Sequence, residues 1–408
     1  MKLLNFKNIL FFISIILFGL YPLIPERYES YVPILFIISS FVLFVTNTKR
    51  KIMWQPLIIM SSLFVAFLIS GFLSENLTRG LKKIETMSSL IAFPIASFWF
   101  LKNAKLDFVR IRSIFFKCFF ISNIIYSIIA FYLLSFYRNP KFSSKDANFL
   151  RNAITDIPYI GDHPIYLSLF LAIAIIIGTI IFRQVKKENG LIKIGILVGQ
   201  LVLISMLLML ISKGVIIGLI FALLLPFIYR KKILKKIIFG SLIIIAIILF
   251  LIPKDNNRFI ELLNKESFEQ VNLNNSTSIR FYILKCSIKM ALEKPFFGHG
   301  LGDVQNELDL RYNINETILP SNKYNSHNQY LFVWLSSGII GLIFFLLFLY
   351  YCFSLAVRSQ DYFFLSILIL FAVSFLFENI LSRQSGVILF SFLVNLLVLK
   401  NLLKKLEE

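Results

Sequence analysis

Long apolar runs recur along the chain and are separated by short polar segments. The run at 191–211 contains one charged residue, Lys193, and the run at 237–252 contains none. Runs of this length match the roughly 20 residues that a helix needs to cross about 30 Å of hydrocarbon. The pattern is continuous rather than alternating, so it excludes a β-barrel, and backbone groups in lipid must be satisfied within the helix. The sequence therefore predicts an all-α polytopic membrane protein.

We predict about 12 membrane-spanning helices from these runs. The predicted spans are 9–25, 31–46, 52–73, 85–101, 113–136, 164–182, 191–212, 214–229, 235–252, 328–355, 361–381 and 386–402. The segment 253–327, between the ninth and tenth spans, is too long for a tight connection and too apolar for disorder. We expect it to form a helical loop domain. It separates an N-terminal membrane part, 1–252, from a C-terminal one, 328–408.

The distribution of basic residues predicts how the chain is oriented. Hydrophobic residues make up 58% of the chain, the mean hydropathy is +0.79 and the formal net charge is +20. In a soluble chain this charge would indicate nucleic acid, but here the basic residues lie mostly in short loops, such as 49–51 and 230–236. This arrangement is typical of cytoplasmic loops, so no nucleic-acid partner is expected. Both termini are then cytoplasmic, and 253–327 is periplasmic. The basic outer connection at 74–84 is the exception.

This orientation brings the polar residues that could do chemistry to one side of the membrane. They are His163, Lys213, Arg280, His299, His327, Glu378 and Arg383. Because the orientation rests on other, cytoplasmic charges, the convergence of these residues outside the membrane indicates a shared site.

Arg280 belongs to a predicted amphipathic helix at 278–293, which follows the N-cap candidates 275–278 and ends before Pro295. In the first turn of that helix, its guanidinium would add to free N–H groups and favour a phosphate. The alternative is an arginine that covers a surface or pairs with Glu293 or another acidic loop residue. A second amphipathic helix is predicted at 257–271.

His327 follows Ser326, and Gln329 stands three residues after that serine, as in a capping box. We therefore expect His327 in the first turn of the tenth membrane helix. The helix dipole there would disfavour protonation, so the imidazole would stay neutral and could accept a proton from a sugar hydroxyl. The alternative is a histidine that only tolerates the interface.

The other polar residues have simpler interpretations. Lys213 would lie in a tight outer turn, where it must reach water or an anion. Glu378 and Arg383 flank another outer turn and could pair with each other. His163 precedes Pro164 and is interpreted as an N-cap.

Cofactor and metal motifs are not apparent. The three histidines do not share a helix at ligand spacing, so no metal site is expected. The glycine-rich stretch 298–302 follows a helix stop, not a strand, and predicts a tight turn rather than a nucleotide-binding loop.

The C-terminal half resembles the O-antigen ligase and polymerase superfamily. The signature of that family is an arginine-led helix, a proline–glycine turn, a variable outer loop and a His-Asn pair at the start of a glycine-spaced membrane helix. The corresponding residues here are Arg280, 295–300, His327 with Asn328, and then Gly338 and Gly341. The match is close over 275–345.

The resemblance implies glycan transfer from an undecaprenyl-pyrophosphate carrier to an acceptor such as lipid A core, on the periplasmic face of a bacterial inner membrane and without cofactor or metal. Arg280 would bind the donor pyrophosphate, and His327 would activate or position the acceptor hydroxyl. Lys213 stands where ligases usually place an arginine, and keeps the charge without the bidentate fork. Supporting or acceptor-side roles are expected for the remaining residues, His163, His299, Asn328, Glu378 and Arg383.

Two alternative functions remain open at this point. A polymerase would use the same donor to extend a second lipid-linked repeat. A flippase or other transporter would need charged residues along a midplane cavity, and the nearly uncharged helix centres of this chain argue against it.

Overall fold

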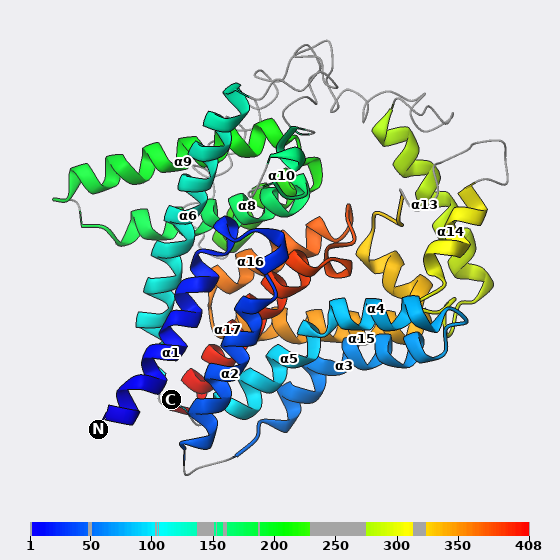
Figure 1. The fold of residues 1–408 in the computed structure, drawn as a ribbon, viewed down its shortest axis with the longest axis horizontal. Coiled ribbons are helices and arrows are strands. Elements are labelled where there is room, and N and C mark those ends of the chain that lie inside the picture. The colour runs from blue at the N-terminus through cyan, green and yellow to red at the C-terminus, as the bar shows by residue number, and fades with distance from the viewer. Residues whose placement is uncertain are drawn as a thin grey trace.

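The computed structural model describes residues 2–47, 51–136 except 103 and 105, 151–228 except 152, 158–160 and 187, 275–312, and 324–407. Every regular element in these residues is helical (Figure 1). The N-terminal helices are α1 Lys2–Gly19, α2 Tyr31–Val45, α3 Trp54–Phe72, α4 Leu77–Met87, α5 Ser89–Ile95, α6 Phe108–Phe136, α8 Pro164–Gln184, α9 Gly190–Leu210 and α10 Lys213–Ile228. The C-terminal helices are α13 Ser276–Glu293, α14 Val304–Tyr312, α15 Gln329–Arg358, α16 Tyr362–Ser374 and α17 Gln384–Glu407.

Seven of the helices in the described residues are long and apolar enough to cross a membrane. Three shorter apolar helices, Lys7–Gly19, Lys213–Leu224 and Tyr362–Ser374, add to them. The chain is thus a multi-pass membrane protein, and the total of about 12 spans stays a prediction. The predicted span 235–252 and the predicted helix 257–271 lie outside the described residues.

The predicted span 85–101 is wrong as a single membrane helix. The helical residues begin earlier, with α4, and continue through α5 into a π-helix, Ala96–Phe100. Pro94 lies inside α5 and cannot donate a backbone hydrogen bond, which explains why regular α-helix does not persist beyond it.

The C-terminal helix α17 lies in the middle of the bundle, although it is last in sequence. The Phe392 ring stacks on Phe18 of α1 with the ring centroids 3.7 Å apart. It also meets Phe36, Phe93 and Phe115 edge-on or at a tilt. Aromatic contacts of this kind join α17 to α1, α2, α5 and α6, so the N-terminal and C-terminal membrane parts share one core.

The membrane helix α15 is broken at Gly338, where φ is 69° and ψ is −170°. The span predicted at 328–355 is confirmed as a membrane-length helix, but its break at Gly338 was not predicted. The turn 295–300 lies against the break: Ile339 N donates to Pro295 O at 2.8 Å, and His299 N donates to Leu335 O at 2.7 Å. Backbone groups that the break frees thus find partners in the turn that follows α13.

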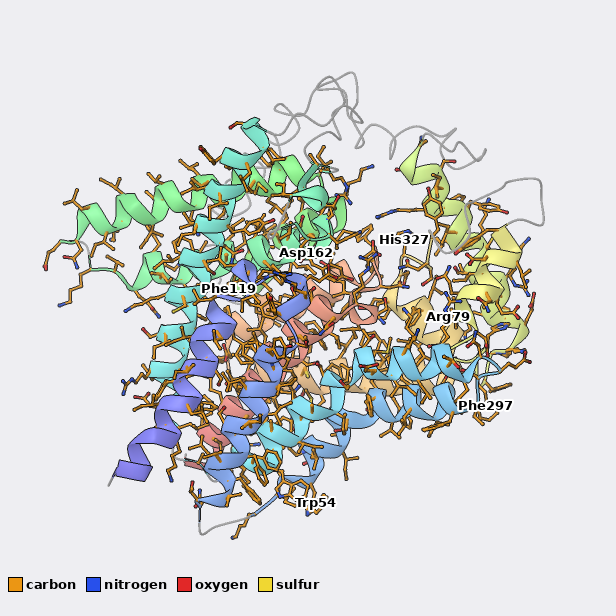
Figure 2. The ribbon with its side chains drawn as sticks, viewed as in Figure 1. Trp54, Arg79, Phe119, Asp162, Phe297 and His327 are labelled. Atoms are coloured by element: carbon orange, nitrogen blue, oxygen red, sulfur yellow. The ribbon has the colours of Figure 1, made fainter. Side chains whose placement is uncertain are left out.

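Residues 302 and 303, which follow this turn, are also fixed to the connection between α3 and α4. The Asp303 carboxylate accepts from Glu75 N at 2.8 Å and from Asn76 N at 2.9 Å, and Ser74 Oγ accepts from Gly302 N at 2.9 Å. Figure 2 shows Phe297 of the turn 295–300 at one end of α3 and Trp54 at the other. Two sets of backbone contacts therefore hold α13 and α14 in place, and α13 carries Arg280.

Candidate functional site

A pocket of about 290 Å³ lies where the first turns of α10 and α13 meet the segments 326–328 and 374–378. Five of the residues singled out in the sequence line it: Lys213, Arg280, His327, Asn328 and Glu378. The apolar part of the wall comes from α10 and α13, through Val215, Ile217, Phe281 and Leu284. The pocket is therefore amphipathic, with cations and an imidazole beside an apolar surface.

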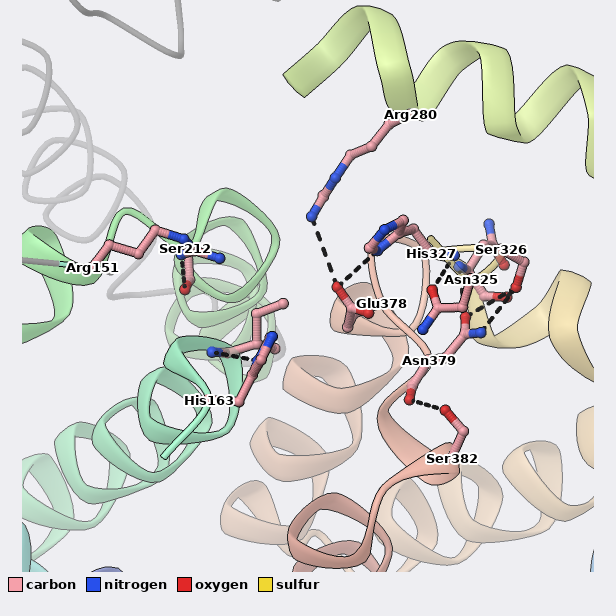
Figure 3. Close-up of polar contacts among 12 residues, drawn as sticks. Arg151, His163, Ser212, Arg280, Asn325, Ser326, His327, Glu378, Asn379 and Ser382 are labelled. Carbon is pink, nitrogen blue, oxygen red and sulfur yellow. Dashed lines mark hydrogen bonds and ion pairs between the residues drawn. The ribbon is translucent and has the colours of Figure 1, made fainter. Parts of the chain in front are cut away.

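His327 and Arg280 both approach the buried carboxylate of Glu378 (Figure 3). His327 Nδ1 lies 3.1 Å from Glu378 Oε2, and Arg280 Nη2 lies 3.8 Å from the same oxygen. Burial raises the pKa of Glu378, but the charge and hydrogen bond of His327, together with the charge of Arg280, outweigh it and lower the pKa to about 2. The carboxylate is thus ionised at neutral pH.

An ionised carboxylate can only accept hydrogen bonds. His327 Nδ1 therefore donates to Glu378, and Nε2 is the nitrogen that can accept a proton when the ring has only one. A histidine held by a carboxylate in this tautomer is the arrangement found in general-base dyads and triads. The predicted pairing of Glu378 with Arg383 is replaced by these two contacts.

His327 lies just before α15 rather than in its first turn, so the predicted capping box is wrong. Asn328 is the N-cap, and its side chain accepts from Leu331 N at 3.1 Å. Asn379 Oδ1 accepts from Ser326 Oγ at 3.1 Å and from Asn328 N at 2.8 Å. His327 itself has a left-handed backbone, with φ 43°. Its imidazole is oriented by the contact with Glu378 rather than by the helix dipole.

Arg280 projects from α13, whose start agrees with the predicted N-cap region. The Asn275 side chain accepts from Thr277 N at 2.9 Å and from Ser278 N at 3.1 Å. Arg280 is the fifth helical residue, so it lies beyond the first turn in which it was predicted. The alternative partner, Glu293, instead forms an ion pair with Arg311.

Lys213 begins α10 directly after α9, as the predicted outer turn requires. Ile211 makes the turn with a left-handed backbone, φ 48°. The Lys213 ammonium lies 3.4 Å from Thr277 Oγ1, so it joins the start of α10 to the start of α13.

Arg151 is a pocket residue that the sequence did not single out. Its Nη1 donates to Leu210 O at 2.5 Å and to Ser212 Oγ at 3.2 Å, beside the turn that holds Lys213. It belongs to the long segment 137–163 between α6 and α8, where no sequence motif marks it. Among the lining residues, Arg151, Lys213 and Arg280 outnumber the single carboxylate of Glu378, which makes the pocket suited to an anion.

Three predicted site residues lie outside the pocket lining. His299 is buried, and its Nε2 lies 2.8 Å from Met290 O. It therefore joins the glycine-rich turn to α13. The Arg383 guanidinium carbon lies 6.0 Å from the Tyr166 ring centre, and His163 Nδ1 accepts from Ile165 N at 3.4 Å as the N-cap of α8. The N-cap interpretation of His163 is confirmed.

His163 makes a prediction about acid stability. Burial, followed by the charge of Arg383, lowers its pKa from 6.5 to about 4. The unfolded chain then binds a proton between these two values that the folded chain does not, so stability falls as the pH drops from 6.5 to 4. His163→Asn keeps an N-cap acceptor but removes this loss. Its melting temperature in detergent should therefore fall less over this pH interval than that of the wild type.

The variant must be compared with the wild type because the neighbouring residue, Asp162, changes stability with pH in the opposite direction. Burial raises the pKa of Asp162 to about 7, so this carboxyl contributes stability that is lost as the pH rises. Asp162 is present in both chains and cancels in the difference. Equal acid sensitivity of the two proteins would contradict a neutral, half-buried His163.

Within the residues that the structure describes, no group of three or more His, Cys, Asp or Glu side chains is arranged to hold a metal ion. The ionisable side chains that line the pocket are an imidazole, a carboxylate and three cations.

Residues 198–346 match a family model described as O-Antigen ligase. This stretch contains Lys213, Arg280 and His327, whereas Arg151 and Glu378 lie outside it. No curated protein matches the chain. The match confirms, over residues 198–346, the resemblance to the O-antigen ligase and polymerase superfamily that the sequence motifs indicated.

Proposed function

We propose that this protein is an O-antigen ligase-like glycosyltransferase that moves a glycan from an undecaprenyl-pyrophosphate carrier to an acceptor such as lipid A core, at the periplasmic face of the inner membrane. The observation that supports this most directly is the contact of His327 Nδ1 with Glu378 Oε2, with Arg280 beside the same oxygen. It combines a base with a cation for a leaving phosphate in one amphipathic pocket.

The donor diphosphate would bind among Arg280, Lys213 and Arg151. A diphosphate leaving group gains negative charge as its bond to the sugar breaks, and fixed cations stabilise that charge. The two guanidiniums can bind phosphate oxygens in a bidentate manner, while Lys213 acts as a point charge. The apolar wall formed by Val215 and Phe281 would receive the first isoprene units of the carrier.

His327 would act as the general base. Its Nε2 takes the proton of the acceptor hydroxyl while that oxygen attacks the anomeric carbon, and the bond from this carbon to the diphosphate breaks with its electrons going to the phosphate oxygen. Glu378 stabilises the imidazolium that forms. One displacement inverts the configuration at the anomeric carbon. A retained configuration or a covalent glycosyl-enzyme intermediate would contradict this mechanism.

The acceptor would approach from the side of Arg383. Burial, together with the charges of Arg79 and Arg383, lowers the pKa of half-buried Lys83 on α4. Arg79, Lys83 and Arg383 are thus three neighbouring cations, and they favour an acceptor that carries phosphate or carboxylate groups. Asn328 would position His327, and His163 and His299 would have structural roles.

A polymerase is the second candidate, because its donor chemistry needs the same pocket. Deletion of the gene in the native host, followed by gel analysis of the surface glycan, separates the two. A ligase predicts loss of glycan-capped lipid with accumulation of long carrier-linked chains, whereas a polymerase predicts lipid capped with a single repeat. Carrier-linked repeats trapped in the cytoplasmic leaflet would reject both and indicate a transporter.

A further inference from the structure

A second cavity, of about 420 Å³, lies at the opposite end of the bundle from the catalytic pocket. Three helices connect the two. Ile165 of α8 lines the pocket and Gln184 lines the cavity, which separates them by roughly 28 Å along the helix. The helix α16 likewise lines the pocket with its last residue, Ser374, and the cavity with its first, Tyr362, while α10 lines the pocket with its first residues and the cavity with Leu223 further along. The distance approximates the thickness of the hydrocarbon core, so the cavity belongs to the other membrane surface.

Four of the five charged side chains that line this cavity are cationic. Arg112 of α6, Arg183 of α8, and Lys400 and Lys404 of α17 line it together with one carboxylate, Asp361. That carboxylate is already engaged: it accepts from Lys400 Nζ at 2.8 Å, from Asn401 Nδ2 at 3.0 Å and, as the N-cap of α16, from Phe364 N at 3.2 Å. The lining therefore keeps a clear excess of positive charge.

The apolar part of the lining comes from the membrane-spanning parts of the helices. Ile176 and Ile180 of α8, Leu223 of α10 and Phe363 of α16 contribute to it. A cavity that is basic at the membrane surface and apolar toward the hydrocarbon matches a phospholipid, which has an anionic head group and acyl chains. A free phosphate ion would use only the basic part.

We propose that this cavity binds the phosphate of an anionic phospholipid from the cytoplasmic leaflet, with Arg112, Arg183 and Lys404 around the head group. The proposal is independent of the glycosyltransferase activity. A bound lipid would join the cytoplasmic ends of α6, α8 and α17, and it would stabilise the folded chain as any ligand of the native state does.

The test compares two double variants of the full-length protein purified in a nonionic detergent. Arg183→Gln/Lys404→Gln removes two lining cations. Lys186→Gln/Lys405→Gln removes two exposed lysines from the same membrane surface, neither of which lines the cavity. Each protein is titrated with phosphatidylglycerol or phosphatidylcholine, and bound lipid is counted by native mass spectrometry alongside the melting temperature.

We expect the wild type and the lysine control to retain phosphatidylglycerol in preference to phosphatidylcholine, with a higher melting temperature. Each basic residue near a membrane surface strengthens binding of anionic lipid about five-fold, so the lining variant should bind about thirty-fold more weakly. Equal melting temperatures without added lipid would show that all three chains are folded.

Three outcomes would overturn the proposal. The first is that the lining variant retains phosphatidylglycerol as tightly as the wild type does. The second is that the lysine control loses it to the same extent as the lining variant, which would indicate general surface attraction. The third outcome comes from a separate arm with inorganic phosphate: stabilisation by phosphate alone, with no further effect of phosphatidylglycerol, would identify a site for a free anion.

Discussion

Replacing His327 with alanine is expected to reduce glycan transfer by a factor of about 10² to 10⁴, the usual contribution of a general base. The substitution removes the acceptor nitrogen that Glu378 holds in position. The measurement is product formation in vesicles that contain the purified protein and carrier-linked glycan from the native host. Release of carrier diphosphate in the same vesicles gives a second readout of the same step.

The control for this experiment is His163→Asn. His163 is a half-buried histidine whose electrostatic neighbours include Glu378 and His327, but its own contact is the N-cap of α8. Asparagine is a good N-cap, so this variant should transfer glycan at close to the wild-type rate. Near-normal transfer by His327→Ala would remove His327 from the chemistry. An equal loss in both variants would show that the region responds only to disruption of its fold.

The helices and the start of α13 were predictable because their signals are local. Continuous apolar runs directly indicate helices that lie in lipid. The start of α13 is indicated by Asn275, which stands immediately before an amphipathic stripe. Arg280 and His327 were found through motifs within a few residues of each. The part of the site that lies in local sequence could thus be predicted.

The partners of these residues could not be predicted, because they come from distant parts of the chain. Glu378 lies 51 residues after His327. The sequence placed both on one side of the membrane but gave no sign that they contact each other. The capping box at 326–329 failed for the same reason. Asn379 binds the Ser326 hydroxyl and the Asn328 amide, and these contacts outweigh a local preference for a serine cap.

Arg151 shows a further limit of sequence reasoning. A single arginine in a long polar segment has no periodic pattern or motif around it. Arg151 is held in the pocket by its hydrogen bond to the Leu210 carbonyl. That carbonyl lies at the end of α9, where the left-handed residue Ile211 ends the helix. Only the folded chain brings these groups together.

Replacing Gly338 with alanine should destabilise the protein by about 3 kcal/mol or more. Its backbone, with φ 69° and ψ −170°, lies in a region that is essentially restricted to glycine. A Cβ at this position would also lie 1.9 Å from Phe296 O, a backbone atom that cannot rotate away. The measurement is the melting temperature in detergent, together with glycan transfer at a permissive temperature.

Transfer should fall along with stability, because the turn that fits the Gly338 break leads directly into α13 and Arg280. Gly298, which has φ 72°, faces the same joint, since a Cβ there would lie 2.7 Å from Gly338 N. Gly195→Ala is the matched control: it changes a glycine inside α9 with no atom within 4 Å of the new Cβ, so it should be neutral or slightly stabilising. If Gly338→Ala melted like Gly195→Ala, the break in α15 would not be a fixed joint, and the family's glycine spacing would need another explanation.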